Sequence, residues 1–375
     1  MSSRRSLPYS TDVFVIGGGP AGLAAAIAAR QQGLSVLVAD GTLVPIDKAC
    51  GEGLLPDGVA ALHELGIQIP RGEAREFRGV RFLNAEQSAA ARFSCSRHGL
   101  AVRRTVLHRA MVERAQQLGA ELLWGSSVRG ISREAVHLRN HAVRARWIVG
   151  ADGSNSRVRR WARLQSSSRP RLRYAFRQHF RIAPWTQHME VYWGEHCQGY
   201  ASGVSGEQMC VALASDDPRM RLEEGLRTLP RLAARLKGAE IVSSERGGLI
   251  GNRELARVWR GNVALIGDAS GTVDAITGEG LGLSFRQALR LAACLESGDL
   301  SPYQLEHRKL ARRPTWMARL MLVMDRRPSL QRRTLEVFQK HPEIFRRFLE
   351  WYVGELPLLD ILKDGLSLGW GLLTT

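Results

Sequence analysis

The sequence predicts an α/β fold in which a parallel-sheet domain is interrupted by an antiparallel β-sheet and followed by a helical C-terminal part. Three observations support this prediction. A glycine-rich turn joins two regular segments near the N-terminus, aromatic and β-branched segments alternate with glycine and proline over 173–214, and the chain beyond residue 302 has helical character. The chain has 375 residues, 44% of them hydrophobic and 24% charged, which is typical of a soluble globular protein.

The first β-α-β unit is expected within residues 11–39. Residues 11–16 and 34–39 are apolar and rich in β-branched side chains, whereas residues 21–31 are rich in alanine. β-Branched residues favour strands and alanine favours helices, so these runs predict a strand, a helix and a second strand of a parallel sheet. The same reasoning predicts a helix over 106–119 and strands over 121–124 and 146–150.

The middle of the chain has a different pattern. Segments 174–182, 189–193, 199–204 and 208–212 predict an antiparallel sheet inserted into the first domain. A strand over 263–266 and a helix over 280–295 return to that domain. We therefore expect nucleotide-binding segments at 10–75, 101–165 and 251–300, substrate-sheet segments at 76–100 and 166–250, and a basic helical region with an apolar tail at 301–375.

Charge and cysteine content limit the functional classes. The formal net charge is +17, and residues 301–350 hold 12 basic and 5 acidic side chains, a net of 12 − 5 = +7. Such a surface attracts polyanions, although an arginine-rich composition explains it equally well. The number of cysteines is odd, and no Cys-x-x-Cys occurs, so neither a disulfide framework nor a zinc site is expected. We expect a cytoplasmic protein, without a signal peptide or membrane span. The cysteines are Cys50, Cys95, Cys197, Cys210 and Cys294.

A glycine-rich loop gives the first functional signal. Gly17, Gly19 and Gly22 fit G-x-G-x-x-G between a strand and a helix. The first glycine permits a tight turn, the second lets the backbone approach a pyrophosphate, and the third allows close packing of helix on strand. Asp40, at the end of the second strand, is placed to bind a ribose hydroxyl. Together they predict a Rossmann-type dinucleotide site, without choosing between FAD and NAD.

Two later motifs favour FAD. Residues 147–157 read Trp-Ile-Val-Gly-Ala-Asp-Gly-Ser-Asn-Ser-Arg, and residues 261–269 read Gly-Asn-Val-Ala-Leu-Ile-Gly-Asp-Ala. With the glycine loop before them, they resemble, over residues 10–300, the flavoprotein superfamily typified by p-hydroxybenzoate hydroxylase and geranylgeranyl reductase. The resemblance implies bound FAD, with NAD(P)H or a partner flavin reductase as electron donor. A second G-x-G-x-x-G is absent, so a separate nicotinamide domain is not expected.

The resemblance also implies roles for individual residues. Asp268 would accept a hydrogen bond from a ribityl or ribose hydroxyl, Asp152 would support FAD and transient nicotinamide binding, and Arg104 would contact the flavin. The start of the helix at Gly280 would favour negative charge on the reduced flavin. The expected cofactor contacts are Gly17, Gly19, Pro20, Ala21, Gly22, Asp40, Gly41, Lys48, Gly51, Arg104, Val128, Asp152, Gly267, Asp268, Gly278, Gly280 and Leu281.

Two motifs are similar to the geranylgeranyl reductase branch of this superfamily. They are Thr-Gly-Glu-Gly at 277–280 and Lys-Ala-Cys-Gly-Glu-Gly at 48–53, although the proline usual before the first motif is replaced by Asp-Ala-Ile. The resemblance therefore implies reduction of a carbon–carbon double bond in a hydrophobic molecule from isoprenoid or natural-product metabolism. The alternative is a monooxygenase that uses NAD(P)H and O2 through a C4a-hydroperoxyflavin. A halogenase is a minor alternative, because the Trp-x-Trp-x-x-Pro signature is absent.

Catalytic candidates are fewer. Cys50 is either a proton-donating or redox thiol near the flavin or a small residue that fills its loop. His179 either faces the substrate or is a structural histidine. Tyr192, Trp193 and Tyr200 lie on the inserted sheet, which forms the substrate wall in this superfamily, although aromatic residues at such positions also form core. No metal ligands are expected.

The apolar tail, Trp351 to Val353 and 356–373, follows a basic stretch. It is expected to pack on the protein, to cover the substrate cavity or a second copy, or to lie on a membrane surface as a peripheral contact. The expected partner is a hydrophobic small molecule, free or delivered by a carrier protein. No nucleic-acid-reading motif is present, and the sequence leaves the oligomeric state open.

Overall fold

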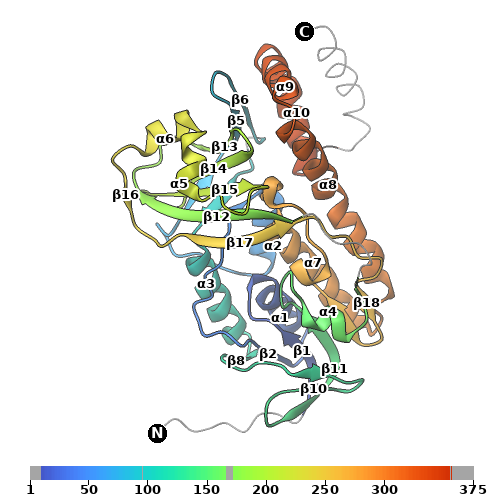
Figure 1. Ribbon diagram of the computed structural model, residues 1–375. Helices are drawn as coiled ribbons and strands as arrows, with labels where there is room; N and C mark the ends of the chain where they lie inside the picture. Colours follow the sequence, from blue (N-terminus) through green and yellow to red (C-terminus); the bar gives the residue numbers. More distant parts are fainter. Residues whose placement is uncertain (1–9, 95, 166–171, 355, 357–375) are drawn as a thin grey trace.

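The computed structural model describes residues 10–94, 96–165, 172–354 and 356 (Figure 1). It is an α/β fold with two large β-sheets and a C-terminal group of helices, as the sequence predicts. Cys95 and most of the predicted apolar tail, residues 357–375, lie outside the described residues.

The first sheet is largely parallel. Its strand order is β18-β19-β11-β1-β2-β8, and the β9–β10 hairpin pairs with β11. The glycine loop follows β1, so it lies at the carboxyl end of the parallel strands, where α/β sheets bind ligands. The bounds are β1 Ser10–Ile16, β2 Val36–Ala39, β8 Glu121–Leu123, β9 Gly130–Ile131, β10 Ala135–His137, β11 Ala142–Gly150, β18 Trp259–Arg260 and β19 Val263–Leu265.

Helices cover one face of this sheet. Val13 and Val15 of β1 share a core with α1 (Pro20–Gln31), α3 (Arg104–Gln117) and α7 (Gly280–Ser297). Phe14 and Ile16 point to the other face, where they pack with Val158 of α4 (Arg157–Trp161) and with β10 and β11. This alternation is that of a strand buried on both faces, which explains why β1 is apolar throughout.

The second sheet is mainly antiparallel and has the order β16-β12-β15-β14-β13-β5-β6, with β17 also paired to β12. The only parallel pair on this path joins β13 to β5, from two distant parts of the chain. Helices α5 (Leu222–Arg227) and α6 (Pro230–Leu236) pack on its outer face. The bounds are β5 Gly79–Leu83, β6 Ser88–Arg92, β12 Leu172–Arg181, β13 His188–Trp193, β14 Cys197–Gly203, β15 Gln208–Ser215, β16 Glu240–Ile241 and β17 Arg246–Gly251.

A small sheet in the order β3-β7-β4 connects the two large ones. It is formed by β3 (Gly53–Leu54), β4 (Ala74–Phe77) and β7 (Gly99–Val102). Helix α2 (Pro56–Glu64) follows β3 and packs closely on α7, where the Cα of Gly282 leaves only 3.0 Å for a side chain at Gly58. The sequence analysis did not predict these short elements.

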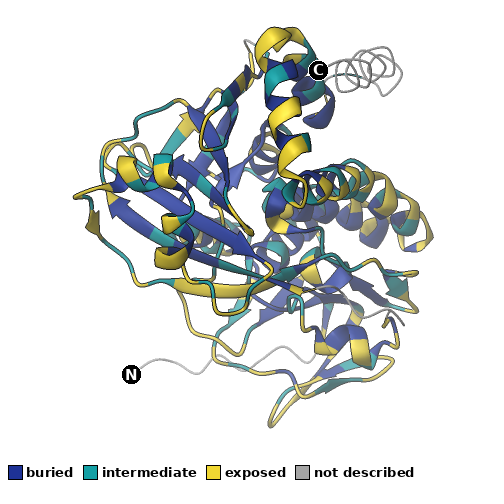
Figure 2. Cartoon of the chain, turned by 45° about the horizontal axis from the view of Figure 1, so that its top comes forward, coloured by how far each residue is buried: buried dark blue, intermediate teal, exposed yellow. Residues whose placement is uncertain are grey.

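The C-terminal helices are α8 (Ser301–Asp325), α9 (Pro328–Lys340) and α10 (Pro342–Tyr352). α8 packs on α7, while α9 and α10 pack on β6 of the second sheet (Figure 1). Next to this contact, Phe345 of α10 stacks on Phe82 of β5 and on Phe338 of α9. Figure 2 shows that the strands are buried and that the outer faces of the C-terminal helices are exposed. Within the described chain, none of the helices combines the length and hydrophobicity needed to cross a bilayer.

Candidate functional site

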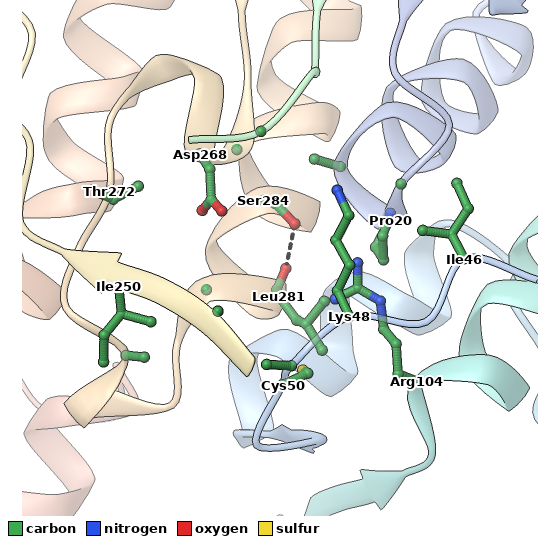
Figure 3. Close-up of a pocket in the computed structure, with 18 of the residues that line it drawn as sticks. Pro20, Ile46, Lys48, Cys50, Arg104, Ile250, Asp268, Thr272, Leu281 and Ser284 are labelled. Carbon is green, nitrogen blue, oxygen red and sulfur yellow. Dashed lines mark hydrogen bonds between the residues drawn. The ribbon is translucent and has the colours of Figure 1, made fainter. Parts of the chain in front are cut away.

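A cavity of about 520 Å³ lies between the two large sheets (Figure 3). One wall comes from the ends of β1 and β2, from the segment after β19 and from the starts of α1 and α7. The other wall comes from β12, β13, β14, β15 and β17. Every cofactor contact predicted from the sequence lines this cavity except Gly22. Segments more than 200 residues apart in the chain therefore meet at one site.

The glycine loop tolerates no side chain at two positions. Gly17 has φ +114°, and a Cβ there would lie 2.4 Å from the carbonyl oxygen of Ala151. A Cβ at Gly22 would lie 1.8 Å from the carbonyl oxygen of Gly17, so Gly22 serves helix packing and does not face the cavity. Gly19 and Pro20 begin α1 on the cavity wall, where the free N–H groups of a helix start favour an anion.

Asp40 fixes the shape of this loop. Its Oδ2 accepts a hydrogen bond from Gly18 N–H at 2.7 Å, and its Oδ1 accepts one from Thr42 N–H at 2.7 Å. A carboxylate has about four acceptor positions, so Asp40 can still bind a hydroxyl group in the cavity.

Charged side chains gather at the centre of the cavity. Asp268, from the short helix η1 (Gly267–Ser270), points inward across from Lys48 and Arg104 (Figure 3). Desolvation raises the pKa of the Asp268 carboxyl, and the positive charges of Arg104, Lys48 and Arg159 oppose this rise. The arrangement offers a hydrogen-bond acceptor and two cations within one cavity.

Three buried polar atoms of the cavity wall lack a hydrogen-bond partner within the described protein. They are Arg104 Nε, Asp152 Oδ1 and Arg177 Nε, and the last of them lies 3.8 Å from Glu52 Oε1. The second oxygen of Asp152 is satisfied, because it accepts hydrogen bonds from the N–H groups of Arg157 and Val158 at 2.6 and 3.1 Å. Buried polar groups are seldom left without partners, so these atoms indicate a missing polar ligand.

Comparison with known proteins shows which cofactor this family binds. Residues 10–298 match the family described as the FAD binding domain. The chain belongs to this FAD-binding family.

The flavoprotein is similar to characterised enzymes and to solved structures. It is 31% identical over 328 residues to menaquinone reductase of Mycobacterium tuberculosis, covering 79% of each chain. It is 26% identical over 304 residues to geranylgeranyl diphosphate reductase of Synechocystis, covering 74% of this chain and 73% of that one. A flavoprotein/dehydrogenase structure from Cytophaga hutchinsonii has a TM-score of 0.77 at 18% identity, covering 92% of this chain and 93% of the other.

The residues present fit FAD. The Nε–H group of Arg104 can donate to a phosphate or carbonyl oxygen, and the free oxygen of Asp152 can accept from a hydroxyl group. A Cβ at Gly278 or Gly280 would meet nothing within 4 Å. NAD(P)H is a typical electron donor for this family. The protein is therefore an FAD-dependent oxidoreductase, and its fold supplies the position and surroundings of the cofactor.

Cys50 lies on the cavity wall in the loop before β3. Its Sγ accepts a hydrogen bond from Glu52 N–H at 3.3 Å, which leaves the thiol hydrogen free to donate elsewhere. Glu52 also lines the cavity, although its side chain is only 1% exposed, and it adopts the left-handed region with φ 58°.

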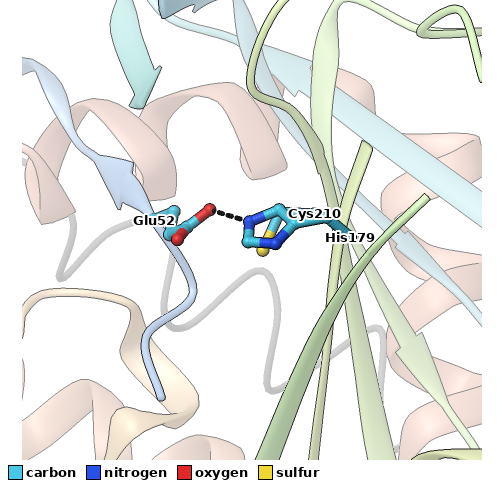
Figure 4. Close-up of side chains that lie close together, drawn as sticks. All are labelled: Glu52, His179 and Cys210. Carbon is cyan, nitrogen blue, oxygen red and sulfur yellow. Dashed lines mark hydrogen bonds and ion pairs between the residues drawn. The ribbon is translucent and has the colours of Figure 1, made fainter. Parts of the chain in front are cut away.

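His179 lies next to Glu52 (Figure 4) and is not one of the residues that line the cavity. It is fully buried, and its Nε2 lies 2.7 Å from Oε2 of Glu52. With Cys210, this pair has the ligand types of a zinc site. Tetrahedral zinc would separate a nitrogen and an oxygen ligand by roughly 3.4 Å, given its bond lengths of about 2.1 Å. The 2.7 Å contact is therefore a hydrogen bond, and burial raises the pKa of the Cys210 thiol, which disfavours a metal-binding thiolate.

The three aromatic candidates occupy different places. Tyr200 lines the cavity and donates to the carbonyl oxygen of Ile276 at 3.0 Å. Tyr192 is buried beneath α5 and α6 and donates to Glu190, and Trp193 stacks on Phe82 at 4.9 Å. Tyr192 points to the sheet face opposite the cavity, and Trp193 lies beyond the cavity at the α10 contact.

Buried charges join the inserted sheet to the flavin-side loops, and the sequence analysis did not single them out. Arg177 of β12 pairs with Asp47 and lines the cavity, and Arg173 of β12 pairs with Asp274 at 3.0 Å. Arg177 lies in the strand predicted over 174–182, whereas Arg173 precedes that segment; in β12 both are separated from His179 by an even number of residues and so share its face. Nothing in the sequence indicated that their partners lie about 100 or more residues away.

Proposed function

We propose that the protein reduces a carbon–carbon double bond in the prenyl chain of a lipid or quinone. The main support is that two segments distant in the sequence line the same cavity, namely the Lys48–Gly53 loop and the Gly278–Leu281 segment. Both belong to the motifs that resemble the geranylgeranyl reductase branch. Support also comes from the 31% identity to menaquinone reductase and the likeness to geranylgeranyl diphosphate reductase, because both substrates contain a prenyl chain.

The inserted sheet supplies an apolar wall for such a chain. Met189, Leu249 and Ile250 line the cavity from β13 and β17, and Val273 adds a further apolar side chain from the flavin-side loop. An apolar substrate fits these groups and displaces water from the cavity. Tyr200 also lines this wall, and its hydroxyl is already bonded to Gln198 and Ile276.

Cys50 provides the proton that this reaction needs. Bound FAD, when reduced by NAD(P)H, supplies the hydride. As the π bond breaks, one carbon receives that hydride and the other receives the hydrogen of the Cys50 thiol. The Glu52 N–H group that donates to Sγ stabilises the thiolate left behind, which takes a proton from water after product release.

A single-turnover experiment tests the proposal. The FAD-loaded protein is reduced with light under anaerobic conditions and mixed with a detergent-solubilised prenyl quinone or prenyl phospholipid. Flavin absorbance and product mass are then followed. We expect flavin reoxidation without O2 and a product that carries one additional hydride and one additional proton. A product that forms only in air and contains one additional oxygen atom would make the protein a monooxygenase and refute the proposal.

A further inference from the structure

The outer ridge of α8 combines exposed apolar side chains with arginines. The apolar residues are Leu305, Trp316 and Val323, and the arginines between and beyond them include Arg312, Arg319 and Arg326. A helix turns by about 100° per residue, so these six positions lie within about 60° of one line. At about 1.5 Å per residue, the ridge is about 30 Å long.

The apolar side chains of the ridge are exposed to water. Leu305 is 58% exposed, Trp316 48% and Val323 45%. Trp316 is nevertheless fixed in place, because its inner edge packs against Trp351 of α10 with ring centroids 5.0 Å apart. A tryptophan held in this way presents a rigid apolar surface to the outside, at little conformational cost on binding.

The ridge keeps a positive charge after its acidic neighbours are counted. Lys309 and Arg308 add to the three arginines, which gives five cations. Two acids lie beside them: Glu306 contacts Lys309 at 2.8 Å, and Glu254 contacts Arg319 at 2.7 Å. The net charge is therefore 5 − 2 = +3.

We propose that this ridge docks on the surface of a bilayer rich in anionic lipid, with Trp316 at the centre of the contact. Leu305, Trp316 and Val323 would enter the boundary between headgroups and acyl chains, and the arginines would contact lipid phosphates. Nucleic acid would satisfy the arginines but not the two exposed aliphatic side chains. A bilayer satisfies both groups at once, which favours it as the partner.

The ridge is also close to the cavity. The short helix η2 (Ala275–Thr277) packs on the inner side of α8, and Ala275 lines the cavity. Docking would therefore bring the cavity wall next to the membrane, from which a lipophilic molecule can enter. The docking itself does not depend on which reaction the protein catalyses, so binding and activity are tested separately.

Vesicle co-sedimentation of the full chain tests the proposal. Vesicles of phosphatidylcholine alone are compared with vesicles that also contain phosphatidylglycerol, at low and high salt. The variants are Trp316→Ser and the double substitution Arg312→Glu with Arg319→Glu. The matched control is Arg133→Glu with Arg139→Glu, which makes the same charge change at exposed sites around β10. Thermal unfolding of each variant shows that it is folded.

We expect salt-sensitive binding that requires phosphatidylglycerol. Trp316→Ser and the α8 double variant should each weaken it at least tenfold, and the control should bind as the parent does. Equal weakening by the control and the α8 variant would mean a diffuse effect of net charge and would overturn the proposal. So would binding that Trp316→Ser leaves unchanged, absence of vesicle binding, or binding of RNA in place of vesicles.

A second measurement does not rely on stability. Brominated lipids quench tryptophan that enters the headgroup boundary. The fluorescence lost on vesicle addition should be smaller for Trp316→Phe than for the parent protein. Equal quenching of the two proteins would show that Trp316 stays outside the membrane and would overturn the proposal.

Discussion

His179 donates a hydrogen bond to Glu52 across the junction between the inserted sheet and the flavin-side loop, with Nε2 2.7 Å from Oε2 (Figure 4). The other ring nitrogen, Nδ1, faces Arg177 Nη1 at 3.2 Å and Ser243 Oγ at 2.9 Å. An arginine can only donate, so Nδ1 accepts and the neutral imidazole carries its hydrogen on Nε2. Neighbouring groups thus fix the tautomer that holds Glu52 in place.

Glu52→Gln should destabilise the protein and weaken FAD binding. Glu52 Oε1 accepts a hydrogen bond from the backbone N–H of Arg104 at 2.9 Å, and Oε2 accepts one from His179. The side-chain amide of a glutamine has only one oxygen, so its NH2 group would have to face one of these two donors. Leaving a buried donor unsatisfied costs about 1–3 kcal/mol. Urea unfolding and flavin titration measure the two effects. The control is Glu240→Gln. Glu240 pairs with Arg181 and its side chain is 61% exposed, so we expect the free energy of unfolding to change by less than about 0.5 kcal/mol. Equal effects of the two substitutions would contradict a special role for Glu52.

Gly22→Ala should prevent FAD binding or folding of the first β-α-β unit. The added Cβ would lie 1.8 Å from the carbonyl oxygen of Gly17 and 3.2 Å from the Cβ of Ala151, so α1 must move away from the loop. Flavin absorbance per mole of purified protein measures the loss. Gly130→Ala is the matched control, because nothing lies within 4 Å of its added Cβ. Full flavin content in Gly22→Ala would show that the loop adapts.

The sequence predicts the parallel domain well because its signals are local. A strand, a glycine turn and an alanine-rich helix follow one another within residues 10–39, and the structure has β1, α1 and β2 there. The helix predicted over 106–119 is α3, which begins two residues earlier, at Arg104, and ends two residues earlier, at Gln117.

The short strands and the contacts around the cavity could not be predicted, because they depend on contacts between residues that are distant in the sequence. β3 and β18 have two residues each and carry no periodicity that a sequence could reveal. Glu52 lies in the motif at 48–53, but its hydrogen-bond partner His179 is 127 residues away in the sequence. Tyr192 and Trp193 had the residue types of a substrate wall, and only the pairing of β13 between β5 and β14 determines which faces they occupy.

Protonated Glu279 should stabilise the protein at low pH, and this contribution should be lost as the pH rises from about 4.5 to 8. Desolvation, together with the negative charge of Asp57, raises the pKa of Glu279 from 4.5 to about 8, although Arg286 opposes the shift and lies 2.6 Å away. Tyr352 of α10 faces the same group. In this pH range the native state holds a proton on Glu279 that the unfolded state has released, so the contribution of Glu279 to the free energy of unfolding decreases as pH increases.

Glu279→Gln should remove this contribution, so that the slope of the free energy of unfolding against pH becomes more positive, because a neutral amide replaces the group that titrates. Urea unfolding at a series of pH values between 4.5 and 8 provides the measurement. Glu296→Gln, at an exposed position on α7, is the control and should keep the slope of the parent protein. An unchanged slope in Glu279→Gln would show that Arg286 keeps Glu279 ionised throughout the range.

Cys50→Ala should slow reduction of the prenyl substrate while leaving reduction of the flavin unchanged. Only the substrate step needs the thiol hydrogen, and loss of a positioned proton donor typically costs about 10²- to 10⁴-fold in rate. Stopped-flow absorbance separates the two steps, because NAD(P)H bleaches the flavin and the substrate restores its colour. Cys294 is a buried residue of α7 that does not line the cavity, so Cys294→Ala controls for the loss of a buried sulfur. Cys50→Ser should recover little, because a hydroxyl is a much weaker acid than a thiol. If Cys50→Ala restores the flavin colour as fast as the parent protein does, the proton comes from another group or from water, and Cys50 only fills its loop.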